Sequence, residues 1–234
     1  MTATPPKRPR RTFKVTLAYD GAAFFGFARQ PDRVTVEGAL RAALEPIEAT
    51  GLAVAGRTDR GVSATGQVIS FHTRTPVTTE AVRDVIDRAA PEALAALNVE
   101  EVPRHFHAAF SARGRAYVYF VDSDVDATRV DRLLVQLLGR RDFSAFARDT
   151  PRGKSTVRHL HTARARRDGS RLRVELAADG FLRRQVRVLT ATAIAAVQAG
   201  APDDYLVALS HTRDRTRTAT PLAPDGLYLT RVVY

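Results

Sequence analysis

Apolar side chains recur along this 234-residue chain with two different periods, and each period predicts a different kind of element. Alternation of apolar with polar residues is typical of a half-buried β-strand. Residues 13–19 alternate in this way, and Asp20-Gly21 ends the segment. The turn signal Asp168-Gly169 indicates a hairpin later in the chain. Further strands are predicted at residues 52–56, 67–72, 115–122, 157–166, 170–177 and 226–234.

Apolar residues three or four positions apart predict helices between these strands. In the first of them, Val36, Leu40, Leu44 and Ile47 share a face, and Thr35 is placed to cap the N-terminus. Other helices are predicted around residues 79–89, 127–138, 181–198 and 203–209.

This order of elements predicts an α+β protein of two similar halves. We expect the halves to form a mostly antiparallel sheet with helices on one side and an active-site cleft between them. The predicted division is a basic flexible tail at 1–11, an N-terminal α+β half at 12–105 and a C-terminal α+β half at 106–234.

The net charge and the composition limit the classes of partner and site that the chain can have. Thirty-six Lys and Arg against 25 Asp and Glu give a net charge of +11, which favours a polyanionic partner. Nucleic acid is the favoured partner and an anionic membrane surface the weaker one. The chain has no cysteine, which excludes disulfides and thiolate metal sites. No apolar run approaches the ~20 residues of a membrane helix, and the N-terminus lacks a secretory signal, so we expect a cytoplasmic protein.

The stretch "AGRTDRGVSATGQV" places one acid, Asp59, between Arg57 and Arg60, with a glycine outside each arginine. One interpretation is a tight turn with solvated arginines. The other is a catalytic carboxylate, acting as nucleophile or base, which the arginines hold ionised and in position.

A second basic cluster lies in "GFLRRQVRVL". We expect Arg183, Arg184 and Arg187 on the first turns of a helix, with Arg183 and Arg187 on one face. They would contact phosphates or simply be solvated. Tyr117 and Tyr119 share a face of their strand, where they would pack in the sheet or stack on a base.

The remaining titratable residues carry weaker signals. The histidines at 105, 107, 159 and 161 alternate along extended segments, but no third metal ligand accompanies them, so metal binding is not favoured. Glu100-Glu101 is interpreted as a solvated charge pair.

Several motifs together resemble the tRNA pseudouridine synthase A (TruA) family. These are "YDGAAFFGFARQ" followed by "TVEGAL", "AGRTDRGVSATGQVISF", "FHAAFSARGRAYVYF", "LLGRRDFSAF", "GFLRRQVRVL" and "DGLYLTRVVY". They extend from about residue 13 to the last residue. The resemblance implies isomerisation of uridine to pseudouridine at positions 38, 39 and 40 of the tRNA anticodon arm. It also implies no cofactor, no metal, and a homodimer in which both subunits hold each tRNA.

The same resemblance implies roles for four residues. Asp59 matches the family's catalytic aspartate, and Arg57 matches the arginine that helps displace the target base. Tyr117 matches a tyrosine that packs on the uracil, and Arg187 an arginine that pairs with the aspartate. Whether the carboxylate attacks C6, attacks C1′ or removes the C2′ proton stays open at this point.

Some positions depart from the usual family pattern. Phe27 and Ala28 stand in a GWQxQ-like segment, Arg60 and Ser63 replace an alanine and a histidine, and Gln185 replaces a methionine. Two other functions remain as alternatives: an RNA-binding or RNA-folding protein without catalysis, and a pseudouridine synthase acting on another RNA or on a nucleoside.

Overall fold

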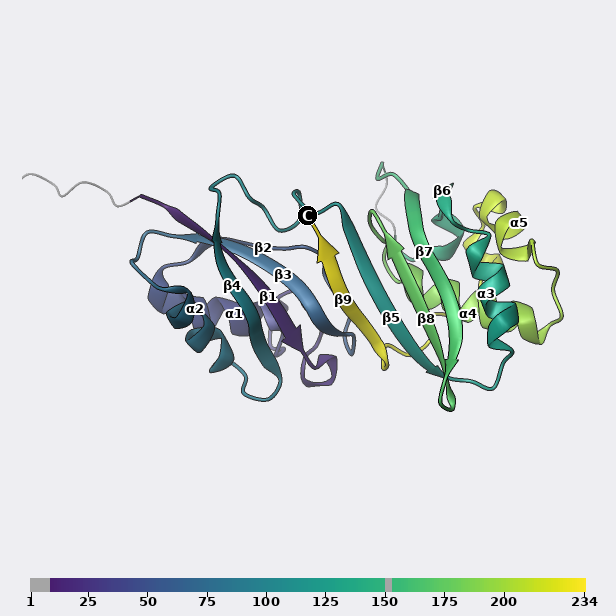
Figure 1. Ribbon diagram of the computed structural model, residues 1–234, viewed down its shortest axis with the longest axis horizontal. Coiled ribbons are helices and arrows are strands. Elements are labelled where there is room, and N and C mark those ends of the chain that lie inside the picture. Colours follow the sequence, from purple (N-terminus) through teal and green to yellow (C-terminus); the bar gives the residue numbers. More distant parts are fainter. Residues whose placement is uncertain (1–8, 150–152) are drawn as a thin grey trace, which may run out of the picture. The chain divides into compact units, whose positions relative to one another are not determined.

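The computed structural model describes residues 9–149 and 153–234, so most of the predicted basic tail lies outside the described residues. The chain divides into two compact units, Met1–Ala112 and Arg113–Tyr234 (Figure 1). The sequence placed this division near residue 105. Each unit combines antiparallel strands with helices, as expected of an α+β protein.

Unit 1 contains four strands and two α-helices within its described residues. In chain order they are β1 (Arg11–Tyr19), α1 (Val36–Leu44), β2 (Thr50–Val54), β3 (Ser63–Thr73), α2 (Thr79–Asp87) and β4 (Leu94–Val102). The strand β1 pairs with β4 on one side and with β3 on the other, and β2 pairs with β3; all of these pairs are antiparallel.

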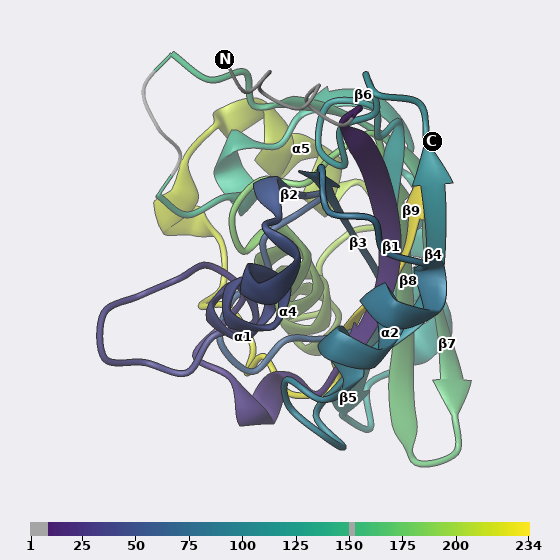
Figure 2. The ribbon, with the colours of Figure 1, turned by 90° about the vertical axis from the view of Figure 1, so that its left-hand side faces the viewer.

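The core of unit 1 lies between this sheet and its helices. Phe13 of β1 and Phe71 of β3 are fully buried, and their rings stack at 5.5 Å. Figure 2 shows α1 to one side of β1 and β4. The side chain of Thr35 accepts a hydrogen bond from the amide of Gly38, which confirms the predicted N-cap of α1. Thr78 caps α2 in the same way.

The strand β4 was not predicted, and it changes the interpretation of Glu100 and Glu101. These acids lie opposite β1, where Glu100 pairs with Lys14 at 2.9 Å and Glu101 pairs with Arg11 at 2.7 Å. Both side chains stay partly solvated, as predicted, but the sequence did not reveal their ion pairs. The pairing partners lie far away in the sequence, so the local pattern gave no sign of them.

Unit 2 contains five strands and three α-helices within its described residues. They are β5 (Gly114–Asp122), α3 (Ala127–Val135), β6 (Gly139–Asp142), β7 (Val157–Asp168), β8 (Arg171–Ala178), α4 (Gln185–Gln198), α5 (Tyr205–Thr212) and β9 (Leu227–Val233). The strand order is β9-β5-β8-β7-β6, and the ladders of β5, β6, β7 and β8 with their neighbours are antiparallel. The predicted hairpin at Asp168-Gly169 is confirmed, with Gly169 at φ +58.

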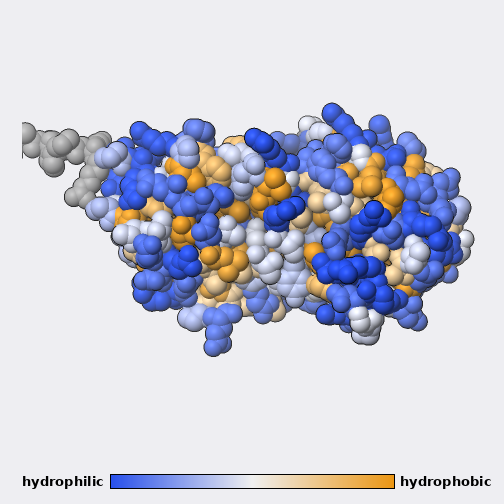
Figure 3. All heavy atoms as spheres, viewed as in Figure 1, coloured by the Kyte–Doolittle hydropathy of each residue, from blue (hydrophilic) through white to orange (hydrophobic). Residues whose placement is uncertain are grey.

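The two faces of the unit 2 sheet differ in polarity. Leu172, Val174 and Leu176 of β8 are buried, and Figure 2 shows α4 to one side of β7 and β8. The opposite face carries exposed arginines such as Arg164 and Arg166, and Figure 3 shows hydrophilic side chains over β7 and β8.

The helix α4 begins at Gln185, four residues later than predicted from Phe181. Arg184 has a left-handed backbone with φ +60, and the side-chain oxygen of Gln185 accepts a hydrogen bond from the amide of Leu182 at 2.8 Å. Arg183 and Arg184 therefore precede the helix, and the prediction that Arg183 and Arg187 share a helical face was wrong. Gln185, one of the departures from the family pattern, forms this entry turn.

The outer edge of β7 is covered by two elements. β6 pairs with β7 over residues 157–160, and beyond them α3 packs against the strand. The carboxylate of Asp131 on α3 accepts a hydrogen bond from the amide of Ala165 at 2.8 Å, and it lies 3.4 Å from the guanidinium of Arg164. A backbone donor that faces away from β8 is thus satisfied by a side chain.

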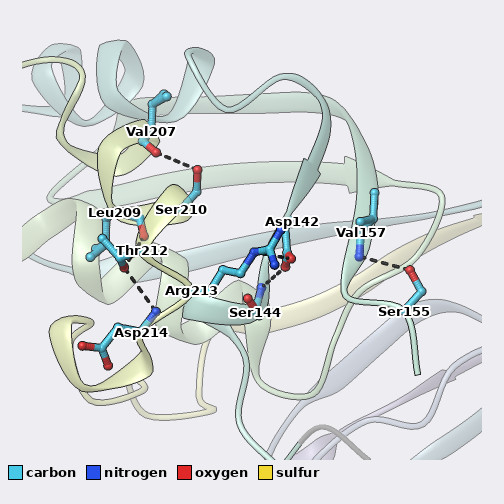
Figure 4. A network of polar contacts seen from close by, with 10 residues as sticks. All are labelled: Asp142, Ser144, Ser155, Val157, Val207, Leu209, Ser210, Thr212, Arg213 and Asp214. Atoms are coloured by element: carbon cyan, nitrogen blue, oxygen red, sulfur yellow. Dashed lines mark hydrogen bonds and ion pairs between the residues drawn. The ribbon is translucent and has the colours of Figure 1, made fainter. Parts of the chain in front are cut away.

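A polar network joins the end of α5 to β6 (Figure 4). Arg213, which follows α5 with φ +54, forms an ion pair of 3.1 Å with Asp142 of β6. Asp142 also accepts a hydrogen bond from the amide of Ser144 at 2.9 Å. The hydroxyl of Thr212 donates to the carbonyl of Leu209 and so closes the last turn of α5. These contacts fix the chain direction after the helix.

Candidate active site

The loop between β2 and β3, residues 55–62, carries the predicted catalytic aspartate. Asp59 is half-buried, whereas Arg57 and Arg60 on either side of it are exposed. Thr58, between Arg57 and Asp59, is only 7% exposed. The backbone carbonyl of Asp59 accepts a hydrogen bond from the amide of Val62 at 3.2 Å, which closes the turn.

A buried hydrogen-bond network beneath this loop was not predicted from the sequence. The hydroxyl of Tyr19, at the end of β1, lies 2.8 Å from the hydroxyl of Thr58. The side-chain amide of Gln67 on β3 donates to the Tyr19 oxygen at 3.2 Å and to the carbonyl of Gly56 at 2.7 Å. The loop is thus held at Gly56 and Thr58, the residues on both sides of Arg57. Tyr19 and Gln67 each place a polar group at one end of an alternating apolar segment. This pattern was the signal in the sequence that could have revealed the network.

Burial raises the pKa of Tyr19 to about 12, and its hydrogen bonds to Thr58 and Gln67 only partly oppose the shift. The protonated phenol is therefore the form that the folded state prefers. An unfolded tyrosine has a pKa near 10, so this contribution to stability is complete below pH 10 and is lost as the pH rises towards 12.

We expect Tyr19→Phe to lower the free energy of unfolding by about 1–2 kcal/mol at pH 8, because Thr58 and Gln67 lose a buried partner. The variant should also lose less stability than the wild type between pH 10 and pH 12. Urea unfolding at several pH values measures both effects, with Tyr205→Phe in α5 as the control. Equal alkaline losses in wild type and Tyr19→Phe would contradict the assignment.

Gly21 and Gly26 allow the segment that follows β1 to approach the catalytic loop. A Cβ at Gly21 would lie 2.6 Å from the carbonyl carbon of Gly61 and closer still to the carbonyl group of Val62. Gly26 has φ +88, and a Cβ there would lie 3.0 Å from the amide nitrogen of Arg60. The backbone after β1 therefore contacts the backbone of the catalytic loop directly, and only glycine fits at these two positions.

Gly21→Ala is expected to lower the free energy of unfolding by about 1–3 kcal/mol, because backbone rather than a flexible side chain has to move. Gly56→Ala is the matched control in the loop itself, since no heavy atom lies within 4 Å of its Cβ position. Chemical unfolding of the two variants tests this. The close approach would be unimportant if Gly21→Ala were as stable as Gly56→Ala.

Three departures from the family pattern have defined places around this loop. The guanidinium of Arg60 lies over the ring of Phe25 at 4.3 Å, and Arg33 lies over the same ring at 4.6 Å. The hydroxyl of Ser63 accepts a hydrogen bond from the amide of Gly21 at 2.9 Å. Phe27 is buried, with its ring 6.3 Å from that of Tyr19. All three residues support the loop without replacing Asp59 or Arg57.

In unit 2 the two tyrosines of β5 lie on one face, as predicted. Tyr117 is paired with Leu176 and Tyr119 with Val174, both buried residues of β8. The ring of Tyr117 is half-buried and meets Phe181 edge to face at 5.1 Å. Tyr119 is 1% exposed, and its hydroxyl donates to the carbonyl of Ala223.

Arg187 lies on α4 beside this tyrosine face. Its Nε donates a hydrogen bond to the carbonyl of Leu222 at 2.7 Å. Burial raises the pKa of Tyr119 to about 12, while the charge of Arg187 and its hydrogen bond to Tyr119 act in the opposite direction. The guanidinium is therefore oriented by two neighbours, a backbone carbonyl and a buried phenol.

The structure thus brings Asp59 and Arg57 together in unit 1, and places Tyr117 and Arg187 in unit 2. The predicted contact between Arg187 and Asp59 joins the two units and stays a prediction.

His159 and His161 lie side by side, with ring centroids 4.3 Å apart, but no group of three or more potential metal ligands occurs within residues 9–149 and 153–234. In the same residues, none of the helices has the length and apolar character needed to cross a bilayer.

Comparisons with known proteins agree with the resemblance seen in the motifs. A family model described as tRNA pseudouridine synthase matches residues 16–111 and 133–234. A protein named tRNA pseudouridine synthase A from Neisseria meningitidis is 33% identical, over 96% of this chain and 92% of its own length. One of the same name from Listeria innocua is 32% identical, over 95% and 98%. The crystal structure of an archaeal box H/ACA sRNP Nop10–Cbf5 complex matches 78% of this chain and 43% of that chain, at 13% identity and a TM-score of 0.39.

Proposed function

The chain belongs to the tRNA pseudouridine synthase A family and is a pseudouridine synthase, and we propose that it isomerises uridine at positions 38, 39 and 40 of the tRNA anticodon arm, with Asp59 as its catalytic nucleophile. The observation that carries the proposal is the placement of Asp59. This acid is half-buried in a loop that a buried network holds in place, and exposed arginines lie on both sides of it.

The reaction breaks the bond between C1′ of the ribose and N1 of the uracil, and forms a bond between C1′ and C5. The hydrogen leaves C5, and N1 gains one, so the product is an isomer of the substrate. A single carboxylate can assist by attacking C6, by attacking C1′ or by removing the C2′ proton. Asp59 serves each route as a carboxylate, because only that form can attack the substrate or accept a proton.

The other site residues take roles that fit their surroundings. Arg57 is exposed at the loop, where it can enter the RNA and help displace the target base, as base-flipping enzymes require. The half-buried ring of Tyr117 offers a flat surface against which the detached uracil is retained. Arg187 holds the carboxylate of Asp59 through its planar donor fork.

The compartment, the oligomeric state and the partners of the enzyme are part of the same proposal. We expect it to act in the cytoplasm as a homodimer that needs no cofactor and no metal, with tRNA as its partner and no membrane. The net charge of +11 supports a polyanionic substrate that is held over a wide surface.

Mapping of pseudouridine in tRNA tests this function. Unmodified tRNA transcripts are incubated with the purified chain, and modified positions are read by chemical labelling and primer extension. Pseudouridine at 38, 39 or 40 is the expected result. Modification only elsewhere, or only in another RNA, would identify a synthase with a different target. Binding of tRNA without any pseudouridine would favour the RNA-folding alternative.

The affinity for tRNA is expected to depend steeply on salt. If at least four phosphates are neutralised, Kd should rise by at least about 100-fold between 50 and 200 mM salt, because condensed counterions are released on binding. Filter binding over this range gives the slope of log Kd against log salt concentration. A flat dependence would argue against RNA as the substrate and favour a free nucleoside.

A further inference from the structure

Phe110 is the most exposed of the large hydrophobic side chains in the described residues, at 87%. The others that are exposed are aliphatic: Val34, Leu97, Leu138 and Val233. A single exposed hydrophobic residue is ordinary on a protein surface. Phe110 is unusual because the backbone and the ring are both held in place.

The turn that carries Phe110 is closed by reciprocal hydrogen bonds. The amide of Ser111 donates to the carbonyl of His107 at 2.9 Å, and the amide of His107 donates to the hydroxyl of Ser111 at 3.1 Å. The amide of Ala108 donates to the hydroxyl of Ser70 at 2.9 Å, which ties the turn to β3. These hydrogen bonds restrain the backbone of the segment.

The ring of His107 fixes the ring of Phe110. Its Nδ1 accepts hydrogen bonds from the amides of Ala109 and Phe110, at 3.2 and 3.3 Å. The two rings stack with centroids 4.3 Å apart and an interplanar angle of 25°. An exposed aromatic surface that is already ordered loses little conformational entropy when it binds a second flat group.

His107, on which the ring of Phe110 stacks, lies beside the start of the catalytic loop. His107 and Ala109 line a cavity of about 420 Å³ together with Gly56 and Arg57, the second of which lies two positions before Asp59. The surroundings are basic as well. Burial lowers the pKa of His72, and the charges of the nearby Arg10 and Arg104 lower it further. Positive charge beside an aromatic surface is the combination that single-stranded nucleic acid recognises.

We propose that Phe110 and His107 form a stacking platform for an unpaired base of the RNA substrate, one close to the target uridine. The inference rests on the proposed function, because it takes the occupant to be the tRNA that Asp59 acts on. The base would stack on the ring of Phe110, close to the nucleotide that Arg57 helps to displace. Stacking accepts any base, so the platform adds affinity and position without reading the sequence.

Tryptophan fluorescence tests the platform directly, because the chain contains no tryptophan. In the Phe110→Trp variant, the new indole is the sole one. Its emission should be quenched in a saturable way by tRNA, with a midpoint that matches the Kd from filter binding. Leu97→Trp, on the exposed side of β4, is the control and should show no such quenching.

Substitutions at Phe110 supply the second measurement. Phe110→Ala and Phe110→Leu should weaken tRNA binding by roughly 5- to 150-fold, the range that loss of one stacked base produces. Phe110→Tyr keeps the π surface and should bind within about 3-fold of the wild type. Since the side chain is 87% exposed, all three variants should unfold at the wild-type temperature.

The outcomes separate this inference from the proposed function. A wild-type chain that neither binds nor modifies tRNA would defeat both. A second outcome is that the wild type binds and modifies tRNA normally, while the fluorescence of Phe110→Trp is not quenched and Phe110→Ala keeps full affinity. That outcome would overturn the platform and leave the proposed function intact. If Phe110→Ala instead turned a dimer into a monomer in the absence of RNA, a second copy of this chain would be the occupant, and the platform would again be wrong.

Discussion

Replacing Asp59 by asparagine is expected to abolish isomerisation and to leave most of the tRNA affinity intact. The loss in turnover should exceed about 1,000-fold, or about 4 kcal/mol of barrier, because an amide can neither attack the substrate nor remove a proton. Affinity should survive because many arginines share the binding, and Asp59 is an acid that contributes nothing to phosphate neutralisation. Tritium release from uracil-labelled tRNA under single-turnover conditions, paired with filter binding, separates the two effects.

Asp32→Asn is the matched control for this experiment. Asp32 is exposed in the same unit and has φ +54, a conformation that asparagine also adopts. It should keep full activity. If Asp59→Asn retained turnover within about tenfold of the wild type, which is 1.4 kcal/mol, the catalytic role of Asp59 would have to be abandoned.

Arg187→Lys is expected to reduce turnover by roughly 100-fold, about 2.7 kcal/mol, with a much smaller effect on tRNA binding. The guanidinium is oriented by the carbonyl of Leu222 and the hydroxyl of Tyr119. A lysine ammonium cannot make these contacts and present a planar fork to Asp59 at the same time. The charge would remain, but the orientation of the catalytic carboxylate would be lost.

Arg183→Lys is the comparison for this change, since Arg183 is exposed and forms an ion pair with Asp149 at 3.2 Å. An exposed pair of this kind contributes little, so Arg183→Lys should turn over normally. Equal rates in Arg187→Lys and Arg183→Lys would refute the role of Arg187. A structure with bound tRNA in which the guanidinium of Arg187 points away from Asp59 would refute it as well.

The elements that the sequence predicted correctly are those whose causes are local. Thr35 caps α1 through the amide of Gly38, three residues away, and Asp168-Gly169 turns β7 directly into β8. Spacing along the chain contains all the information that such features need. The loop that carries Asp59 was found for the same reason, because its arginines and glycines are adjacent to it.

The sequence did not reveal two kinds of feature: contacts between residues far apart in the chain, and one local turn at the start of a helix. Tyr19 meets Thr58 and Gln67 only after β1 and β3 have paired. The start of α4 was placed four residues too early, because the side chain of Gln185 accepts a hydrogen bond from the amide of Leu182 and residues 181–184 form a turn before the helix. The Tyr19 contacts need the folded sheet, whereas the Gln185 turn is local but interrupts no apolar spacing, so the periodic pattern gave no sign of it.

The bond between Asp131 and the amide of Ala165 has a consequence for the behaviour of the protein in a crowded cell. An open strand edge is a template on which another chain can add a strand, and such additions lead to aggregation. At Ala165 the donor that an incoming strand would need is already occupied by a carboxylate, and the charged Arg164 stands next to it. Addition of a foreign strand is therefore disfavoured at Ala165. The hydrogen bond from Ala165 to Asp131 thereby reduces aggregation through the edge of β7.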